Sequence, residues 1–273
     1  MTLLAHHVAI SGRTGFVLEA TPHRPNDATL VLVHTAGQSG VQWRHALQPL
    51  ADLGYRVLVP DLPGHGHSEP AQGGAVTDLR DYADWLVRLL EQLDLDQAPI
   101  VVGCSIGGKV AQDLAVRYGN RLTAAVSMCA EAGPGRGKVH ALRREFEDSG
   151  APARRDRTHL GTRAVIGSSV SPDRAALIAQ MHCREDPEVS ISDLIGWCTH
   201  DVRDHLPGVE VPMTFVAGSD DLWVDAAAVK QAAARVSRAQ YVLLDGYGHY
   251  PMEEMDGFAK VLDDWILTMR EQH

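Results

Sequence analysis

The chain of 273 residues has few cysteines, no long apolar run and no excess of positive charge. Its four cysteines show neither CxxC spacing nor the density of a disulfide scaffold, so we expect free thiols in a reducing compartment. No stretch approaches the roughly 18 apolar residues of a membrane-spanning helix. The first ten residues lack the basic start and the apolar run of a signal peptide. We therefore expect a cytoplasmic protein with no membrane partner.

The charge balance argues against nucleic acid as a partner. There are 25 Lys and Arg against 35 Asp and Glu, a formal net charge of −10. Affinity for a phosphate backbone rests on clustered basic residues. What the chain does have is 45% hydrophobic residues, enough for a sizeable buried core in one large domain or two small ones.

Short β-branched runs alternate with longer segments of helical periodicity, which predicts an α/β fold: a mostly parallel, eight-stranded sheet flanked by helices. The segments VAIS and GFVLEAT are expected to form a leading hairpin, and six further strands are predicted at 30–34, 55–60, 99–104, 122–129, 212–218 and 241–245. Helices are predicted at 77–93, after Gly103, at 225–236 and at 257–269. Thr77 or Asp78 is the expected cap of the first.

The alternation breaks between residues 133 and 207, where the pattern becomes helical and charged. This stretch has 11 basic and 11 acidic residues, so the rest of the chain carries the whole −10. It opens with the flexible sequence GPGRG and ends with LPGVEVP. We interpret it as a helical cap, or lid, inserted into a core formed by residues 1–132 and 208–273.

The sequence VVGCSIGGKV, residues 101–110, is the clearest chemical motif. Gly103-x-Ser105-x-Gly107 leads from a predicted strand into a predicted helix, and a turn this sharp crowds the two positions that flank its apex. Ser105 therefore projects as a nucleophile. Centring the turn on Cys104 would put Val102 and Ile106 in the crowded positions, so Cys104 is interpreted as a packed side chain.

A phosphate-binding loop is the rival interpretation of the same stretch. Gly103 and Gly108-Lys109 have the spacing of such a loop, but Val110 stands where a Ser or Thr is needed to hold magnesium. Nucleotide binding is therefore disfavoured, and no cofactor is expected.

Five segments in order make the chain resemble the α/β-hydrolase superfamily, on the branch of capped serine esterases, lactonases and carbon–carbon bond hydrolases. The resemblance spans residues 8–269 and rests on His34-Thr35-Ala36-Gly37, Asp61-Leu62-Pro63-Gly64-His65-Gly66-His67-Ser68, Gly103 to Gly108, Gly218-Ser219-Asp220-Asp221 and Gly248-His249-Tyr250-Pro251.

The resemblance implies a catalytic triad of Ser105 as nucleophile, Asp221 as acid and His249 as base, in the chain order that this fold uses. A serine hydroxyl is scarcely nucleophilic at neutral pH, so an imidazole must remove its proton and a carboxylate must hold the imidazole. Asp220 competes for the acid role. The family's acid usually stands three residues after the glycine, which favours Asp221.

The resemblance also implies an oxyanion hole of two backbone N–H groups, from Ile106 and Ala36. His34 is expected to support the loop. Thr35 departs from the family's usual His-Gly pattern, which leaves the path of the loop open. The remaining histidines lack paired-ligand spacing, so no metal site is expected.

A serine at the elbow excludes, by the same resemblance, the epoxide hydrolases and dehalogenases, which use an aspartate there. The sequence thus predicts hydrolysis of a small carboxylic ester or lactone by water through an acyl-enzyme intermediate. A carbon–carbon bond hydrolase, a perhydrolase, an acyltransferase and a non-catalytic binding protein of the same fold remain alternatives.

Several residues are candidates for lining the substrate pocket. The first candidates are His34, Thr35, Trp43, Trp197 and Trp223. Residues of the predicted cap join them as further candidates, with lid core as the alternative interpretation: Met181, His182 and His140. A carboxylated substrate would suit Arg154, Arg155 and Arg157, for which a solvated charged face is the alternative.

Overall fold

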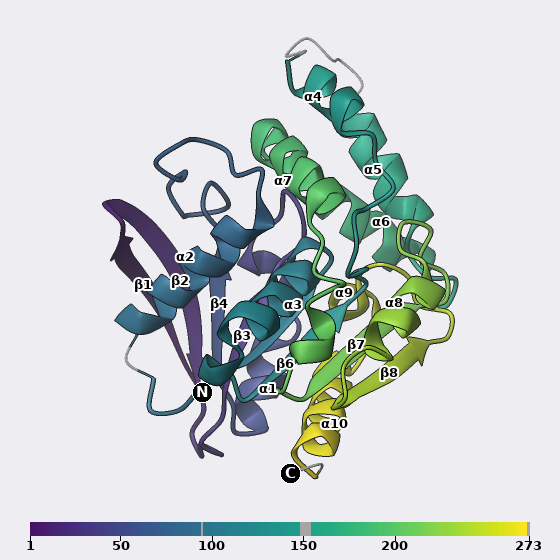
Figure 1. The fold of residues 1–273 in the computed structure, drawn as a ribbon. Coiled ribbons are helices and arrows are strands. Elements are labelled where there is room, and N and C mark those ends of the chain that lie inside the picture. The colour runs from purple at the N-terminus through teal and green to yellow at the C-terminus, as the bar shows by residue number, and fades with distance from the viewer. Residues whose placement is uncertain (94, 148–153, 272–273) are drawn as a thin grey trace.

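The computed structural model describes residues 1–93, 95–147 and 154–271 and contains one eight-stranded sheet (Figure 1). The strand order is β1-β2-β4-β3-β5-β6-β7-β8. Only the β1–β2 and β2–β4 pairs are antiparallel; the other neighbours are parallel. The leading hairpin and the mostly parallel sheet are as predicted. The strands are β1 (Thr2–Ile10), β2 (Arg13–Thr21), β3 (Thr29–Val33), β4 (Arg56–Asp61), β5 (Ile100–Cys104), β6 (Ala124–Met128), β7 (Met213–Gly218) and β8 (Ala239–Leu244).

Helices cover both faces of the sheet, and the alternation of side chains along each strand divides the core between them. In β3, Leu30 and Leu32 pack with α1 (Leu47–Asp52) and α10 (Phe258–Glu271). Val31 and Val33 point the other way, toward α2 (Leu79–Gln92) and α3 (Ile106–Tyr118). On the latter face α8 (Ala226–Ala233) covers β7 and β8. All these β3 residues are fully buried, so the centre of the sheet is a rigid base for the loops that follow its strands.

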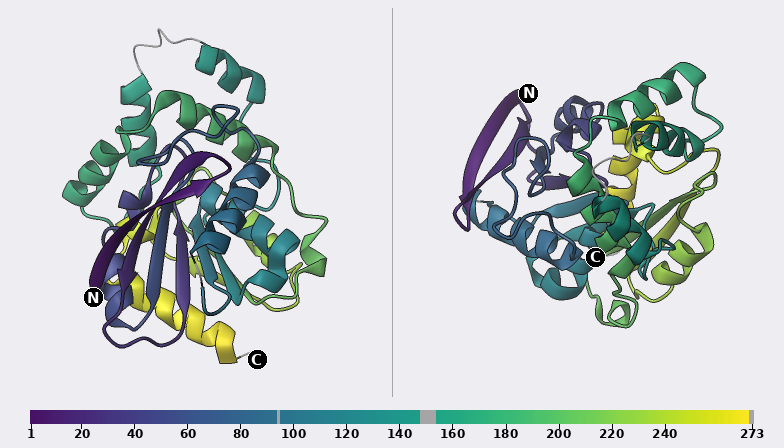
Figure 2. Two further views of the ribbon diagram at one scale, coloured as in Figure 1. Left: turned by 90° about the vertical axis from the view of Figure 1, so that its left-hand side faces the viewer. Right: turned by 90° about the horizontal axis from the view of Figure 1, so that it is seen from above.

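Four helices gather at one end of the sheet, as Figures 1 and 2 show from three directions. They are α4 (Val139–Glu147), α5 (Arg154–Ala164), α6 (Pro172–His182) and α7 (Pro187–Thr199). Ser171 and Asp186 cap α6 and α7 by accepting backbone N–H groups. These helices fall within the stretch 133–207 that the sequence marks as a cap; residues 148–153 of that stretch lie outside the described part of the chain.

The remaining elements are short. The helix α9 (Pro251–Glu254) follows the loop that carries His249, and three 3₁₀ turns lie at η1 (Gly40–Trp43), η2 (Gly119–Arg121) and η3 (Leu206–Gly208). The predicted helix at 77–93 is observed as α2, and its cap is Asp78, whose carboxylate accepts the Arg80 N–H. None of the described helices is both long and apolar enough to cross a membrane.

Candidate active site

Ser105 stands at a strained turn between β5 and α3. Its backbone has φ 57° and ψ −119°, a conformation that costs a non-glycine residue energy. The flanking glycines are sterically required: a Cβ on Gly103 would lie 2.0 Å from the Gly107 carbonyl oxygen, and one on Gly107 would lie 2.5 Å from the Val33 carbonyl oxygen. This crowding is the steric reason why the spacing of Gly103 and Gly107 predicts a sharp strand-to-helix turn, or nucleophile elbow, at Ser105.

Cys104, the rival nucleophile, is fully buried in the core beside α10. Its thiol donates to the His249 carbonyl oxygen at 3.1 Å, and burial raises the pKa of the thiol. A protonated, enclosed thiol is a poor nucleophile. Cys104 is therefore a packed side chain next to the candidate nucleophile.

Asp221 and His249 form a buried pair on neighbouring loops at the ends of β7 and β8. The distance from His249 Nδ1 to Asp221 Oδ2 is 2.7 Å, and the two side chains are 2% and 1% exposed. Asp221 Oδ1 accepts the N–H groups of Trp223 and Val224, which fix the carboxylate. Because a carboxylate acceptor requires Nδ1 to carry the proton, Nε2 is left as the basic nitrogen of His249.

Asp220, the alternative acid, points elsewhere. Its carboxylate accepts the Ser168 N–H at 2.7 Å and the Ser219 hydroxyl at 2.8 Å, and the bonds from Ser168 and Ser219 lower its pKa. These contacts tie the end of β7 to the segment after α5. Of the two adjacent aspartates, the geometry brings Asp221 to His249.

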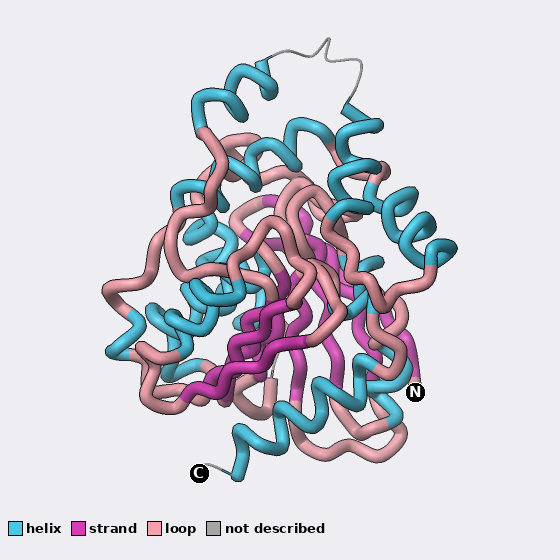
Figure 3. Tube along the Cα trace, turned by 90° about the vertical axis from the view of Figure 1, so that its right-hand side faces the viewer, coloured by secondary structure: helices cyan, strands magenta, loops and turns pink. Residues whose placement is uncertain are grey.

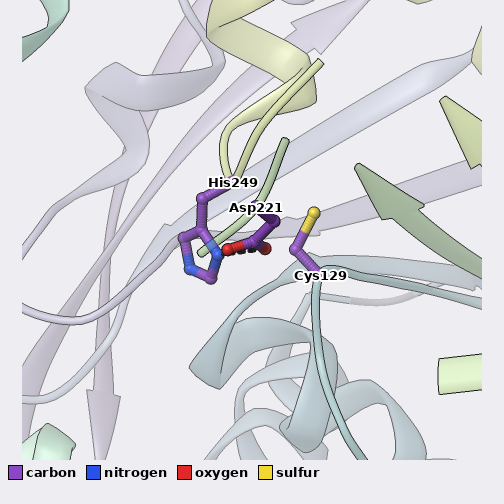
Figure 4. A group of neighbouring side chains, drawn as sticks. All are labelled: Cys129, Asp221 and His249. Atoms are coloured by element: carbon purple, nitrogen blue, oxygen red, sulfur yellow. Dashed lines mark hydrogen bonds and ion pairs between the residues drawn. The ribbon is translucent and has the colours of Figure 1, made fainter. Parts of the chain in front are cut away.

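Cys129 is the third side chain near this pair (Figure 4). Among the described residues, Cys129, Asp221 and His249 have potential metal-ligating atoms within 4.8 Å of one another. A metal ion would have to displace the Asp221–His249 bond. It would also need the Cys129 thiolate, although a hydrogen bond with Cys104, together with burial, raises the pKa of that thiol well above its ordinary value. We interpret the group as an acid–base pair packed against a thiol.

The loop after β3 has a backbone N–H, that of Ala36, between two N–H groups that are bound by side chains. The N–H of Thr35 is bound by Gln42 Oε1 at 2.9 Å, and the N–H of Gly37 by Asp193 Oδ2 at 2.8 Å. Within the described part of the chain, the Ala36 N–H between them has no acceptor. Ile106 opens α3, where the first N–H groups have no intrahelical partner. These are the two amides that the resemblance assigns to an oxyanion hole.

His34 holds this loop from beneath. Its Nε2 accepts the Leu62 N–H at 3.0 Å, so Nδ1 carries the proton and donates to the Thr35 carbonyl oxygen at 2.9 Å. Burial lowers the pKa of His34 to about 4, which keeps the ring neutral at physiological pH. The ring is fully enclosed and does not line the substrate cavity, so the expectation that His34 also binds substrate needs correction.

A cavity of about 490 Å³ joins the candidate residues beneath the four helices. The loops that follow the strands lie between the sheet and these helices (Figure 3). Of the predicted residues, the cavity wall includes Thr35, Ala36, Ser105, Trp197, Trp223 and His249, together with His182, Arg154 and Arg157. Arg155 is not part of the wall. The rest of the wall is largely apolar and includes Leu142, Ile191, Leu194 and Leu222.

Trp43 is the second correction. Its side chain is fully buried and packs against Phe258, with ring centroids 6.0 Å apart, so it belongs to the core beside α10. The residue follows the predicted oxyanion loop in sequence, but η1 turns its side chain into the core. The prediction that Trp43 lines the substrate cavity, made from its position after the oxyanion loop in the sequence, is therefore wrong.

Two polar residues that the sequence did not single out organise the site. Gln42 accepts both the N–H and the hydroxyl of Thr35, and it donates to Glu253 at 3.0 Å. Asp193 reaches the loop from α7, across a separation of 156 residues. Local sequence carries no signal for such contacts, because neither residue lies in a short motif.

The chain is similar in sequence and in fold to known hydrolases. A sequence model described as "Alpha/beta hydrolase family" matches residues 30–261. The chain is 25% identical to a pimeloyl-[acyl-carrier protein] methyl ester esterase of Vibrio cholerae, over 85% of this chain and 92% of that protein. It is also 25% identical to epoxide hydrolase A of Mycobacterium tuberculosis, over 85% and 88%. The crystal structure of an enol-lactonase from Burkholderia xenovorans superposes with a TM-score of 0.82 at 21% identity, over 96% of this chain and all of that one, a likeness of fold.

Proposed function

The chain belongs to the alpha/beta hydrolase family and is a hydrolase of that fold, and from this premise we propose that it cleaves a small carboxylic ester or lactone through an acyl-enzyme intermediate. One observation carries the proposal. Ser105 on its strained elbow and His249, whose Nδ1 is bound by Asp221, line the same cavity. Ala36 lies in the wall of the same cavity.

In the proposed first step, Ser105 Oγ attacks the substrate carbonyl carbon while His249 Nε2 takes the hydroxyl proton. The carbonyl oxygen becomes an oxyanion that accepts the N–H groups of Ala36 and Ile106. One such donor is typically worth about 10²–10³ in rate. His249 then donates its proton to the leaving alkoxide, and Asp221 stabilises the imidazolium meanwhile.

In the second step, water loses a proton to His249 and attacks the acyl carbon of the Ser105 ester. The tetrahedral intermediate collapses, and Ser105 regains its proton as the carboxylic acid leaves. A lactone follows the same course, except that its alcohol and its acyl group leave as one molecule. The reaction consumes one water and needs no cofactor.

Because one relative is an epoxide hydrolase, the type of nucleophile decides whether this chain suits an epoxide or an acyl substrate. Opening an epoxide through a covalent intermediate requires a carboxylate nucleophile, since the resulting ester can be hydrolysed at its carbonyl carbon. Attack by Ser105 would leave an ether that water at this site cannot cleave. The serine therefore favours acyl substrates such as the methyl ester of the esterase relative.

We also propose that residues 133–207 act as the cap that selects the substrate. The apolar wall comes mainly from α4 and α7 and from the loop after β7. That composition suits an apolar acyl or alkyl group, with the ester bond held at Ser105.

The test is turnover of p-nitrophenyl acetate and butyrate by the wild type and Ser105→Ala, with intact-mass analysis after a fluorophosphonate probe. We expect the wild type to turn over the ester and gain one adduct. Ser105→Ala should gain none and should lose about 10⁶ in kcat. A folded wild type that is neither active nor labelled would favour a binding protein. Substantial activity in Ser105→Ala would refute the assignment of the nucleophile.

A further inference from the structure

Asp193 is a buried carboxylate of α7 that binds three separate parts of the core. Its Oδ2 accepts the Gly37 N–H and the His65 Nε2–H, each at 2.8 Å, and its Oδ1 accepts the Tyr82 hydroxyl at 2.6 Å. The side chain is 0% exposed. One residue of the predicted cap, residues 133–207, thus joins the loop after β3, the turn after β4 and helix α2.

The bond to Gly37 controls the direction of the neighbouring amide. Gly37 has φ +66°, and a Cβ there would lie 2.8 Å from both Glu185 Oε2 and Ser190 Cβ, so the loop is pressed against the start of α7. Gln42 holds the Thr35 peptide on the other side. The carbonyl oxygen of the peptide that carries the Ala36 N–H accepts His34 Nδ1–H and the Gln38 N–H. Gln42 and Asp193 hold the peptides on either side of it, and the Asp193 bond fixes the Gly37 side.

The Asp193 carboxylate changes the protonation of His65, one of its buried partners. Burial opposes a charge on His65, but the attraction and the hydrogen bond of Asp193 outweigh it and raise the pKa of His65. His34 faces His65 with ring centroids 4.6 Å apart, and the Asp193 carboxylate also faces Tyr82.

We propose that Asp193 is a positioning residue for the oxyanion hole: by holding the Gly37 peptide it aims the Ala36 N–H at the reacting carbonyl. This inference rests on the proposed serine hydrolase function. The predicted cap, residues 133–207, thus contributes to catalysis as well as to the wall of the cavity. The competing view is that Asp193 only fastens α7 to the core.

Four variants separate the two views. Asp193→Ala removes the acceptor. Asp193→Asn keeps an oxygen for Gly37 without the charge, whereas Asp193→Glu keeps the charge and displaces the oxygen by one methylene. Tyr82→Phe is the matched control, because it removes a buried partner of Asp193 and leaves the Gly37 bond in place.

The readouts are kcat and KM for p-nitrophenyl butyrate, the inhibition constant of an alkyl trifluoromethyl ketone, and the melting temperature. The ketone forms a tetrahedral adduct whose oxyanion needs the same N–H groups. We expect Asp193→Ala to lower kcat by about 10–100-fold, with KM changed less than about threefold. It should weaken ketone binding by a similar factor. Asp193→Glu should follow it, Asp193→Asn should stay within about fivefold of the wild type, and Tyr82→Phe within about twofold.

An Asp193→Ala protein that folds and keeps its kcat and its ketone affinity would overturn the proposal. So would a loss of activity that follows melting temperature alone across the four variants, Tyr82→Phe included. If Asp193→Ala does not fold, the Asn and Glu variants decide, since a merely electrostatic or fastening role predicts that Glu is the better substitute. Failure of the proposed function shows differently, as a wild type without turnover or fluorophosphonate adduct.

Discussion

Gly107→Ala should inactivate the enzyme without unfolding it. The added Cβ would lie 2.5 Å from the Val33 carbonyl oxygen and 2.7 Å from that of His34. Both are backbone atoms, so neither can swing aside. Ordinary contact at about 3.4 Å then requires the start of α3 to move away from the loop after β3 by about 0.9 Å, the difference between 3.4 and 2.5.

That displacement separates the two amides of the proposed oxyanion hole. The Ile106 N–H belongs to the start of α3, and the Ala36 N–H belongs to the loop that the Cβ would push. A misplacement of about 1 Å costs about 10²-fold in rate, and loss of a donor costs about 10²–10³. We therefore expect kcat for p-nitrophenyl butyrate to fall by about 10²–10³.

The stability change should be small by comparison. Overpacking costs about 1–3 kcal/mol, and Ala recovers about 1 kcal/mol over Gly inside a helix. The net cost of about 0–2 kcal/mol corresponds to a fall in Tm of less than about 8 °C. Calorimetry beside the kinetic assay separates the two effects.

Gly119→Ala is the matched control at the other end of α3. Its backbone is α-helical, with φ −53° and ψ −37°, and its new Cβ would meet nothing closer than Val211 Cγ1 at 3.5 Å. We expect wild-type kcat from this variant. If Gly107→Ala also kept kcat within about threefold of the wild type, the steric reasoning and the assignment of the oxyanion hole would both be refuted.

Three further predictions concern single contacts. Asp221→Asn should lower kcat by about 10⁴ because it favours the wrong His249 tautomer. Asp220→Asn keeps an acceptor for the Ser168 N–H, and its kcat should stay near that of the wild type. Equal losses of kcat in the ester assay would contradict the choice of Asp221 as the acid. Burial lowers the pKa of His34 to about 4 in the folded state, so its neutral ring should add about 3 kcal/mol to the free energy of unfolding above pH 6.5, and this should be lost as pH falls toward 4. Urea unfolding of the wild type and His34→Gln between pH 4 and 7 should therefore show different dependences of stability on pH. Identical dependences would contradict the prediction. Glu254 accepts three backbone N–H groups beside His249, so Glu254→Gln should destabilise the fold by about 1–3 kcal/mol in urea unfolding, and an unchanged midpoint would count against that role.

Local signals in the sequence account for the sheet and for the elbow. β-branched runs bounded by glycine and proline predict strands whatever the rest of the chain does, and they predict the hairpin and the mostly parallel sheet that the structure has. The elbow follows from glycine spacing because the clash is between residues four apart in sequence, Gly103 and Gly107. The choice of Asp221 over Asp220 stays a prediction that the observed His249 contact supports.

Burial and long-range pairing account for what the sequence did not reveal. Trp43 and His34 are residue types that often contact ligands, yet both are enclosed, and enclosure depends on elements distant in sequence such as α10. Gln42 and Glu254 are unremarkable in sequence. Their role arises only when the fold brings backbone N–H groups toward them.

Hydrogen bonds tie the predicted cap, residues 133–207, to the proposed machinery, and this limits how freely the cap can change. Asp193 accepts the Gly37 N–H beside the oxyanion loop, and the Val165 carbonyl oxygen accepts the His249 N–H at 2.8 Å. Removing the Asp193 carboxylate leaves a buried donor unsatisfied, at a cost of about 1–3 kcal/mol, next to a group whose placement governs the rate. The Val165 acceptor is a backbone carbonyl oxygen that any residue at this position supplies. Substrate preference can therefore vary through the apolar wall of α4 and α7, but only in sequences that keep a side-chain acceptor at position 193.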